Sequence, residues 1–161
     1  MQRIERCTAL LMAMETTMAE EIVTKNPETM AAPGGHYSHA VTANGFVFVA
    51  GQLPIAHDGR KLADAPFEVQ AQQALDNVAA ALAGAGSAVD RLVQVRVYVT
   101  DISAWLAFNT VYAEWAGAAR PARAVVPVPE LHYGFKVEIE AVALAGGQGG
   151  GQAEARAKAT D

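Results

Sequence analysis

The sequence predicts an α+β domain in which two helices pack on one face of a mixed β-sheet. The order of the expected elements is strands, helix, strand, helix, strands. Apolar residues recur at helical spacing in two segments and alternate with polar residues in two others. Hydrophobic residues make up 52% of the chain, which is enough for a proper core.

The first half of the domain is expected to form a strand and a helix. Asn44-Gly45 is typical of a turn, and the run 46–49 after it predicts a strand that 51–54 ends. Pro66 suits the first turn of a helix, and Gly84 or Gly86 can end that helix. Its buried face is expected to contain Ala71, Leu75, Val78 and Leu82.

The second half is expected to form strand, helix and two more strands. Valines at 93, 95, 97 and 99 alternate with polar residues and predict a half-buried strand. Asp101 or Ser103 can cap the next helix, and Gly117 can close it. Its buried face is expected to contain Trp105, Phe108, Tyr112 and Trp115. The final strands are expected near 123–128 and 136–144.

The last strand mixes charged and aliphatic residues on one face. Lys136, Glu138 and Glu140 point one way, and Val142 and Leu144 continue that face. Such a mixture predicts burial against a partner subunit.

One domain is expected at 21–145. The tail 146–161 is rich in glycine and charge, and residues 1–20 lack a matching pattern, so both ends are expected to be disordered. Arg3 and Arg6 precede a short apolar run at 8–14, a pattern that is compatible with a signal peptide. The run is short and acidic residues follow it, which favours an extension before a natural start at Met14 or Met18.

Composition argues against several classes of function. The net charge of -5 and the scattered Lys and Arg residues argue against a nucleic-acid partner. No apolar stretch approaches the roughly 20 residues that span a bilayer. Cys7 is the only cysteine, so the sequence predicts no disulfide, no cysteine metal cluster and a cytoplasmic location. His36 and His39 lie among glycines and strand-like residues, which argues against a zinc site.

Two charges stand in strand-like surroundings near the end of the chain. Arg123 begins an apolar strand, and its guanidinium can hold a carboxylate through two hydrogen bonds. Glu138 or Glu140 in the last strand can transfer protons if its pKa is raised. The alternative is structural: a salt bridge from Arg123 to Glu138, Glu140 or a neighbouring subunit, with the glutamates on a solvated sheet face. Asn109 and Tyr37 can hydrogen-bond a ligand; the alternatives are a polar residue on the exposed side of its helix for Asn109 and an ordinary half-buried aromatic for Tyr37.

Several motifs together resemble one family. They are VFVAGQLP at 47–54, AQQALDNVAAAL at 71–82, VYVTDISAWLAFNTVYAEW at 97–115, and PARAVV at 121–126 followed by VEIEAVA at 137–143. Over residues 37–144 the chain resembles the RidA/YjgF family of enamine and imine deaminases, also called L-PSP endoribonucleases or translation inhibitors. The resemblance implies a chorismate-mutase-like fold and a homotrimer with a central β-barrel and three clefts between subunits.

The resemblance also implies roles for individual residues. The carboxylate-binding arginine falls on Arg123, and the water-orienting glutamate falls on Glu138, not on Glu140. Ligand contacts fall on Asn109 and Tyr37. One subunit would supply Arg123 and Asn109, and its neighbour would supply Tyr37 and the region of Gly51.

Two positions depart from the family pattern. Ala50 replaces a common serine, and Val125 replaces a common cysteine. The resemblance implies that the position of Val125 binds ligand largely through backbone groups, which a valine keeps. Ala50 lacks the hydroxyl of the serine. The departures leave the substrate preference open.

The resemblance implies a hydrolase that acts like a 2-iminobutanoate/2-iminopropanoate deaminase. Such an enzyme converts 2-imino acids, the tautomers of enamines such as 2-aminoacrylate, to 2-keto acids and ammonia without a metal or organic cofactor. One alternative is a trimer that binds small carboxylates without turnover. Another is an endoribonuclease or translation inhibitor.

Overall fold

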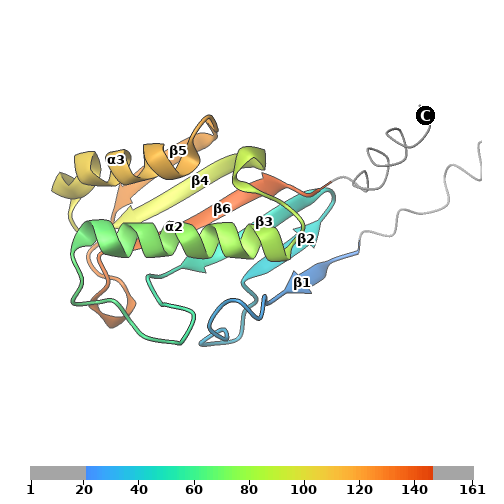
Figure 1. Cartoon of the computed structure of the whole chain (residues 1–161), viewed down its shortest axis with the longest axis horizontal. Helices are drawn as coiled ribbons and strands as arrows, with labels where there is room; N and C mark the ends of the chain where they lie inside the picture. Colours follow the sequence, from blue (N-terminus) through green and yellow to red (C-terminus); the bar gives the residue numbers. More distant parts are fainter. Residues whose placement is uncertain (1–20, 147–161) are drawn as a thin grey trace, which may run out of the picture.

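A computed structural model describes residues 21–146 of the 161-residue chain. They form one six-stranded sheet with the order β1-β2-β3-β6-β4-β5, and both helices lie on the same face of it (Figure 1). Neighbouring strands are antiparallel except for β4 and β5, which are parallel. The predicted α+β class is confirmed. The predictions for 1–20 and 147–161 lie outside the described residues.

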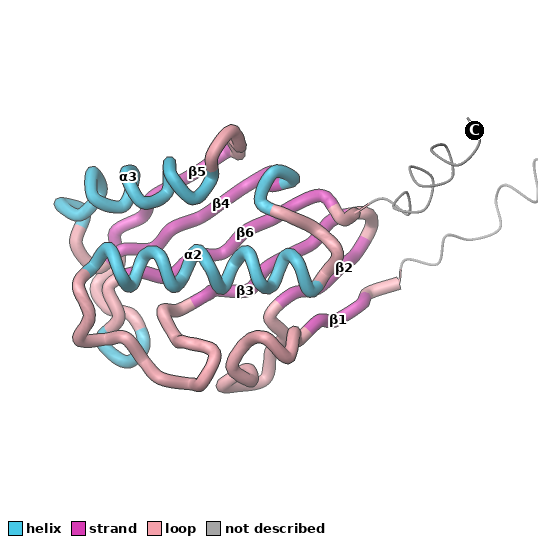
Figure 2. The backbone as a smooth tube through the Cα atoms, in the orientation of Figure 1, coloured by secondary structure: helices cyan, strands magenta, loops and turns pink. Residues whose placement is uncertain are grey.

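The elements are close to those that the sequence predicts (Figure 2). The helices are α2 (Phe67–Gly84) and α3 (Trp105–Ala116), and the short 3-10 helices are η1 (Val89–Arg91), η2 (Ile102–Ala104) and η3 (His132–Gly134). The strands are β1 (Val23–Lys25), β2 (Ala40–Ala43), β3 (Phe46–Gln52), β4 (Leu92–Val99), β5 (Ala122–Pro127) and β6 (Val137–Leu144). Strand β3 is longer than predicted because it continues past Val49 through an irregularity in its pairing with β6.

The core lies between the helices and one face of the sheet. The predicted face of α2 is fully buried, and so are Val95, Val97 and Val99 of β4. The prediction for Val93 is wrong: a register shift between Leu92 and Gln94 interrupts the alternation, and Val93 is 41% exposed. In α3, Phe108 and Tyr112 are buried, but Trp105 is 41% exposed because it lies in the first turn, at the end of the helix.

A buried glutamine joins α2 to two loops. Gln70 is completely buried, and its amide nitrogen donates to the carbonyls of Ala63 and Ala65 at 2.9 and 3.0 Å. Its amide oxygen accepts from the backbone N–H of Lys136 at 3.0 Å, just before β6. The sequence pattern gives no sign of this buried role, because a polar side chain at a helical position is normally solvent-exposed.

We expect Gln70→Leu to lower the free energy of unfolding by about 2–4 kcal/mol, because it leaves three partly buried backbone groups without their partner. The measurement is urea denaturation at a fixed protein concentration. The control is Gln72→Leu on the same helix, where the exposed side chain bonds only to Asp76. Equal stability of Gln70→Leu and Gln72→Leu would show that the three bonds are unimportant.

Candidate functional site

The predicted pair Arg123 and Glu138 lies on opposite faces of the sheet. Arg123 is directly opposite Val95 in β4, and Glu138 is directly opposite Tyr98. Residues opposite each other on neighbouring strands share a face, and odd and even positions of β4 point to opposite faces. Arg123 therefore lies on the helix-covered face and Glu138 on the open face. A single subunit does not bring the two side chains together.

The guanidinium of Arg123 rests on one turn of α3. Its Nη2 donates to Oδ1 of Asn109 at 2.8 Å, which leaves most of its N–H groups available. The guanidinium carbon lies 4.4 Å from the ring centre of Tyr112 and 5.9 Å from that of Phe108. Stacking on an aromatic ring and one neutral partner orient the charge without neutralising it. This arrangement suits a carboxylate ligand.

The structure contradicts the predicted alternative of a salt bridge from Arg123 to Glu138 or Glu140. Among residues 21–146, Arg123 has no acidic partner within 4.0 Å. Glu140 pairs with Arg96 on the open face, with 2.7 Å between Oε1 and Nη1, and also accepts from the hydroxyl of Tyr98 at 3.0 Å. Glu140 is thus occupied, and the two glutamates of β6 have different surroundings.

Glu138 lies against the irregular part of β3. Val49 is opposite Ala141 and Gln52 is opposite Ile139, so β3 has one extra residue at 50–51. Such a bulge changes the direction of side chains and often lies beside functional sites. At Gly51 a Cβ atom would overlap the carboxylate of Glu138. The absence of a side chain at Gly51 therefore makes room for this carboxylate.

Burial raises the pKa of Glu138 above its ordinary 4.5. Nearby His132 lowers this pKa, and the negative charge of Glu140 raises it. A half-buried carboxyl group with a raised pKa is suited to accept and return a proton. This property separates Glu138 from Glu140.

The remaining predicted residues divide between the same two regions. Val125 is opposite Val97, two residues after Arg123 and on the same face. Tyr37 lies in the loop before β2, 48% exposed, with its ring edge-on to His39 at 6.1 Å. The Arg123 half-site therefore comprises Arg123, Asn109 and Val125. The Glu138 half-site comprises Glu138 and Gly51, and Tyr37 joins it through His39 and Gln52.

Sequence reasoning missed the supporting residues of both half-sites. Phe108 and Tyr112 were expected to be core residues, yet their rings also lie beneath Arg123. His39 was weighed only as a metal ligand, but it is 7% exposed and hydrogen-bonded inside the protein. The positions 108, 109 and 112 share one face of a predicted helix. This spacing could have indicated that Phe108 and Tyr112 lie beside Asn109 and support Arg123.

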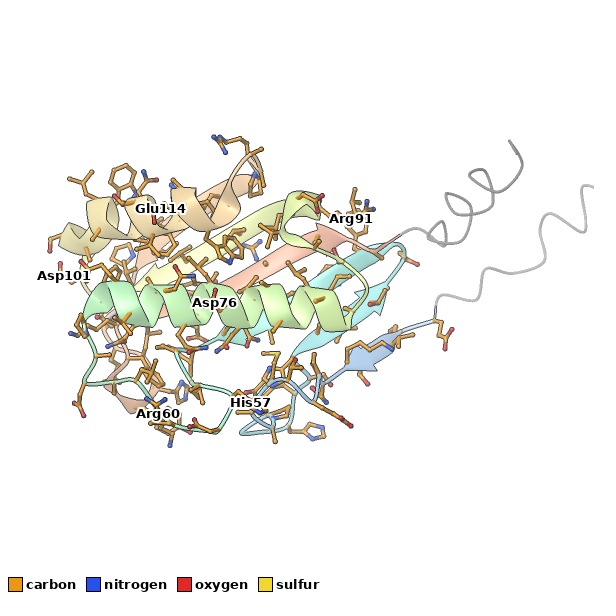
Figure 3. The ribbon with its side chains drawn as sticks, in the orientation of Figure 1. His57, Arg60, Asp76, Arg91, Asp101 and Glu114 are labelled. Carbon is orange, nitrogen blue, oxygen red and sulfur yellow. The ribbon has the colours of Figure 1, made fainter. Side chains whose placement is uncertain are left out.

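Two hollows on the surface of the described residues lie apart from both half-sites. One, of about 120 Å³, lies on the open face beside the Arg96–Glu140 pair. The other, of about 390 Å³, lies between α2 and α3, where Asp76 and Glu114 face it (Figure 3). Its carboxylates would repel an acidic ligand. Within the described part of the chain, no three potential metal ligands gather and no helix is long and apolar enough to cross a membrane.

Known proteins are similar to this chain in sequence and in fold. The family model described as Endoribonuclease L-PSP matches residues 28–145. Protein HMF1 of Saccharomyces cerevisiae is 35% identical over 130 residues, which cover 81% of this chain and 97% of the relative. A RutC family protein of Pyrococcus horikoshii is 37% identical over 78% of this chain and 98% of its own.

Solved structures of related proteins have a similar fold. The YjgF gene product of E. coli has a TM-score of 0.71 and 32% identity, and covers 76% of this chain and 98% of its own. E. coli TdcF, solved with bound serine, has a TM-score of 0.70 and 29% identity over the same shares. With a family match over most of its length and relatives above 30% identity, the chain belongs to the Endoribonuclease L-PSP family, in the group that includes the RutC and RidA/YjgF proteins.

Proposed function

We propose that the protein hydrolyses reactive 2-imino acids to 2-keto acids and ammonia at a site formed between two subunits. The observation that carries the proposal is the presence of two complementary but separate half-sites. One offers an oriented arginine without an acidic partner among the described residues, and the other offers a carboxyl group with a raised pKa. Each half-site lacks what the other provides.

Arg123 binds the substrate in this proposal. Its guanidinium forms two parallel hydrogen bonds with the carboxylate of the imino acid, while Asn109 and the ring of Tyr112 hold it in place. The two bonds fix the orientation of the imine carbon relative to the carboxylate. Backbone groups of Val125 and Gly51, and the hydroxyl of Tyr37, complete the binding site.

Glu138 of the neighbouring subunit directs water to the imine carbon. The water oxygen attacks this carbon, the C=N double bond becomes a single bond, and Glu138 transfers the proton of the water to the nitrogen. Glu138 then transfers the hydroxyl proton of the carbinolamine to its amino nitrogen. The C–N bond breaks, ammonia leaves, and the carbonyl of the 2-keto acid forms. Free imines already hydrolyse in water, so the modest catalysis that positioning and proton transfer provide is sufficient.

The open face of the sheet supports a homotrimer as the functional assembly. Its exposed apolar residues are Phe46, Phe48, Val126 and Leu144, which lie on the same face as Glu138. Exposed apolar side chains beside a partly exposed ion pair are typical of a surface that another subunit covers. A cyclic trimer that buries this face as a central barrel would place the Glu138 half-site of one subunit beside the Arg123 half-site of the next.

The direct test is ammonia release from the imine that an amino-acid oxidase produces, compared with and without the protein. We expect faster loss of the imine that semicarbazide can trap. The second candidate function is binding of small carboxylates without turnover, which Ala50 and the bound serine of TdcF favour. Calorimetric binding of 2-ketobutyrate without accelerated imine loss would select this second function.

The family description also raises cleavage of RNA. The net charge of -5 disfavours the phosphate backbone. RNA cleavage that disappears in Arg123→Ala and co-elutes with the trimer would support that activity. Cleavage that persists in the variant would indicate a contaminant.

We expect Gly51→Ala to reduce turnover about tenfold while the protein stays folded. The added Cβ displaces the flexible end of Glu138, so the fold changes little while the carboxylate loses its position. The measurement combines kcat with the melting temperature. Gly34→Ala is the control, because a Cβ there meets open space. Unchanged kcat in Gly51→Ala would contradict the assignment of Glu138.

A further inference from the structure

The bulge beside Glu138 is held by the backbone of a buried histidine and by the side chain of a buried glutamine, which the histidine ring contacts in turn. The N–H of Ala50 donates to the carbonyl of His39 at 3.0 Å, and the carbonyl of Ala50 accepts from Nε2 of Gln52 at 3.0 Å. His39 is 7% exposed and Gln52 is 3% exposed. Both backbone groups of the residue before Gly51 are therefore fixed by these two neighbours.

The contacts of His39 determine its protonation. Its Nε2 lies 2.8 Å from the carbonyl oxygen of Ala31, which can only accept. Its Nδ1 lies 3.5 Å from Nε2 of Gln52, which can only donate. Turning the amide of Gln52 would set its oxygen against the carbonyl of Ala50, so this amide orientation is preferred. The imidazole is therefore neutral, with its proton on Nε2.

The same histidine holds the loop that contains Tyr37. The N–H of His39 donates to Oδ1 of Asn26 at 2.8 Å, which ties the start of β2 to the end of β1. The ring of Tyr37 meets the imidazole edge-on at an interplanar angle of 89°. His39 thus contacts both the loop of Tyr37 and the bulge of Gly51.

We propose that His39 is a positioning residue, which with Gln52 joins Tyr37 and the Gly51 bulge into one rigid unit of the Glu138 half-site. The inference rests on the proposed function for its catalytic consequence. Neither the substrate nor the reacting water touches His39. It acts by fixing the distance between the tyrosine and the bulge, and the neutral Nε2–H form is the one that can make both of its bonds.

The test compares His39→Gln, which keeps one donor and one acceptor, with His39→Leu, which keeps neither. We expect kcat/KM to fall about 10- to 100-fold in His39→Leu and to stay within about threefold of wild type in His39→Gln. His57→Leu is the control, because His57 is exposed in the loop before α2 (Figure 3). Long-range ¹H–¹⁵N spectra of wild type should show His39 as the Nε2–H tautomer.

Three results would overturn the inference: a charged or Nδ1–H imidazole, a His39→Gln variant as impaired as His39→Leu, or unchanged kcat/KM in folded His39→Leu. If His39→Leu does not fold, the tautomer of wild-type His39 and the kcat/KM of His39→Gln still test the inference. A wild type that binds 2-ketobutyrate without turnover would overturn the proposed deaminase activity alone. The same variants are then compared by their affinity for 2-ketobutyrate.

Discussion

Replacing Arg123 with alanine is expected to lower kcat/KM for 2-imino acids by two to three orders of magnitude. The variant loses two charge-assisted hydrogen bonds to the substrate carboxylate, which together contribute about 3–4 kcal/mol. Most of the loss should be seen as a higher KM, because the carboxylate is bound both before and during the reaction. Both effects, the lower kcat/KM and the higher KM, are measured by steady-state kinetics with an imine generated in the assay.

Arg123→Lys should recover only part of this loss. A lysine keeps the charge but cannot form two parallel bonds or stack as a plane on Tyr112. Arg120→Ala is the matched control, since the exposed Arg120 bonds only to the carbonyls of Gly117 and Ala119 in its own loop. Equal KM values for Arg123→Ala and wild type would remove Arg123 from the site.

Replacing Glu138 with glutamine is expected to lower kcat about 100-fold, because the amide can neither accept nor return the proton of the attacking water. Binding of 2-ketobutyrate should remain within about threefold of wild type, because Arg123 is intact. Glu140→Gln is the control on the same face: it disturbs a partly exposed salt bridge with Arg96 and a hydrogen bond from Tyr98, but leaves the carboxyl group of Glu138 in place. A Glu140→Gln variant as slow as Glu138→Gln would contradict the choice between the two glutamates.

The pH dependence of the wild type follows from the same carboxyl group. Burial raises the pKa of Glu138 above the ordinary 4.5. As the pH falls, Glu138 therefore becomes protonated at a pH higher than 4.5. The acid limb of kcat/KM should accordingly lie above pH 4.5. Glu140→Gln removes a charge that raises the pKa of Glu138, so it should move this limb to lower pH. A shift of the limb to higher pH would contradict the assignment.

The sequence predicted the elements of the fold because their patterns are local. Alternating valines in β4 and helical spacing in α2 each record one buried face, and the structure confirms both. The failures at Val93 and Trp105 are also local. A shift in strand register and the end of a helix cannot be read from periodicity alone.

The site was less accessible because its parts come from different faces. Sequence spacing placed Arg123 and Glu138 on successive strands, but β6 lies on the far side of β4 from β5 and presents Glu138 to the open face. The bulge at Gly51 and the bridge through His39 depend on contacts between distant segments. Resemblance to a family supplied the expectation of an intersubunit site, and the positions of the two half-sites give that expectation a physical basis.

Subunit mixing tests most directly whether two chains form each site. Arg123→Ala and Glu138→Gln each retain one intact half-site, so at a substrate concentration well below the wild-type KM each homotrimer should be nearly inactive. After unfolding and refolding of an equal mixture, three quarters of the trimers are mixed and each has one intact interface, so about a quarter of wild-type activity should return. Mixed trimers that form, as shown by native mass spectrometry, but stay as inactive as their parents would contradict the account.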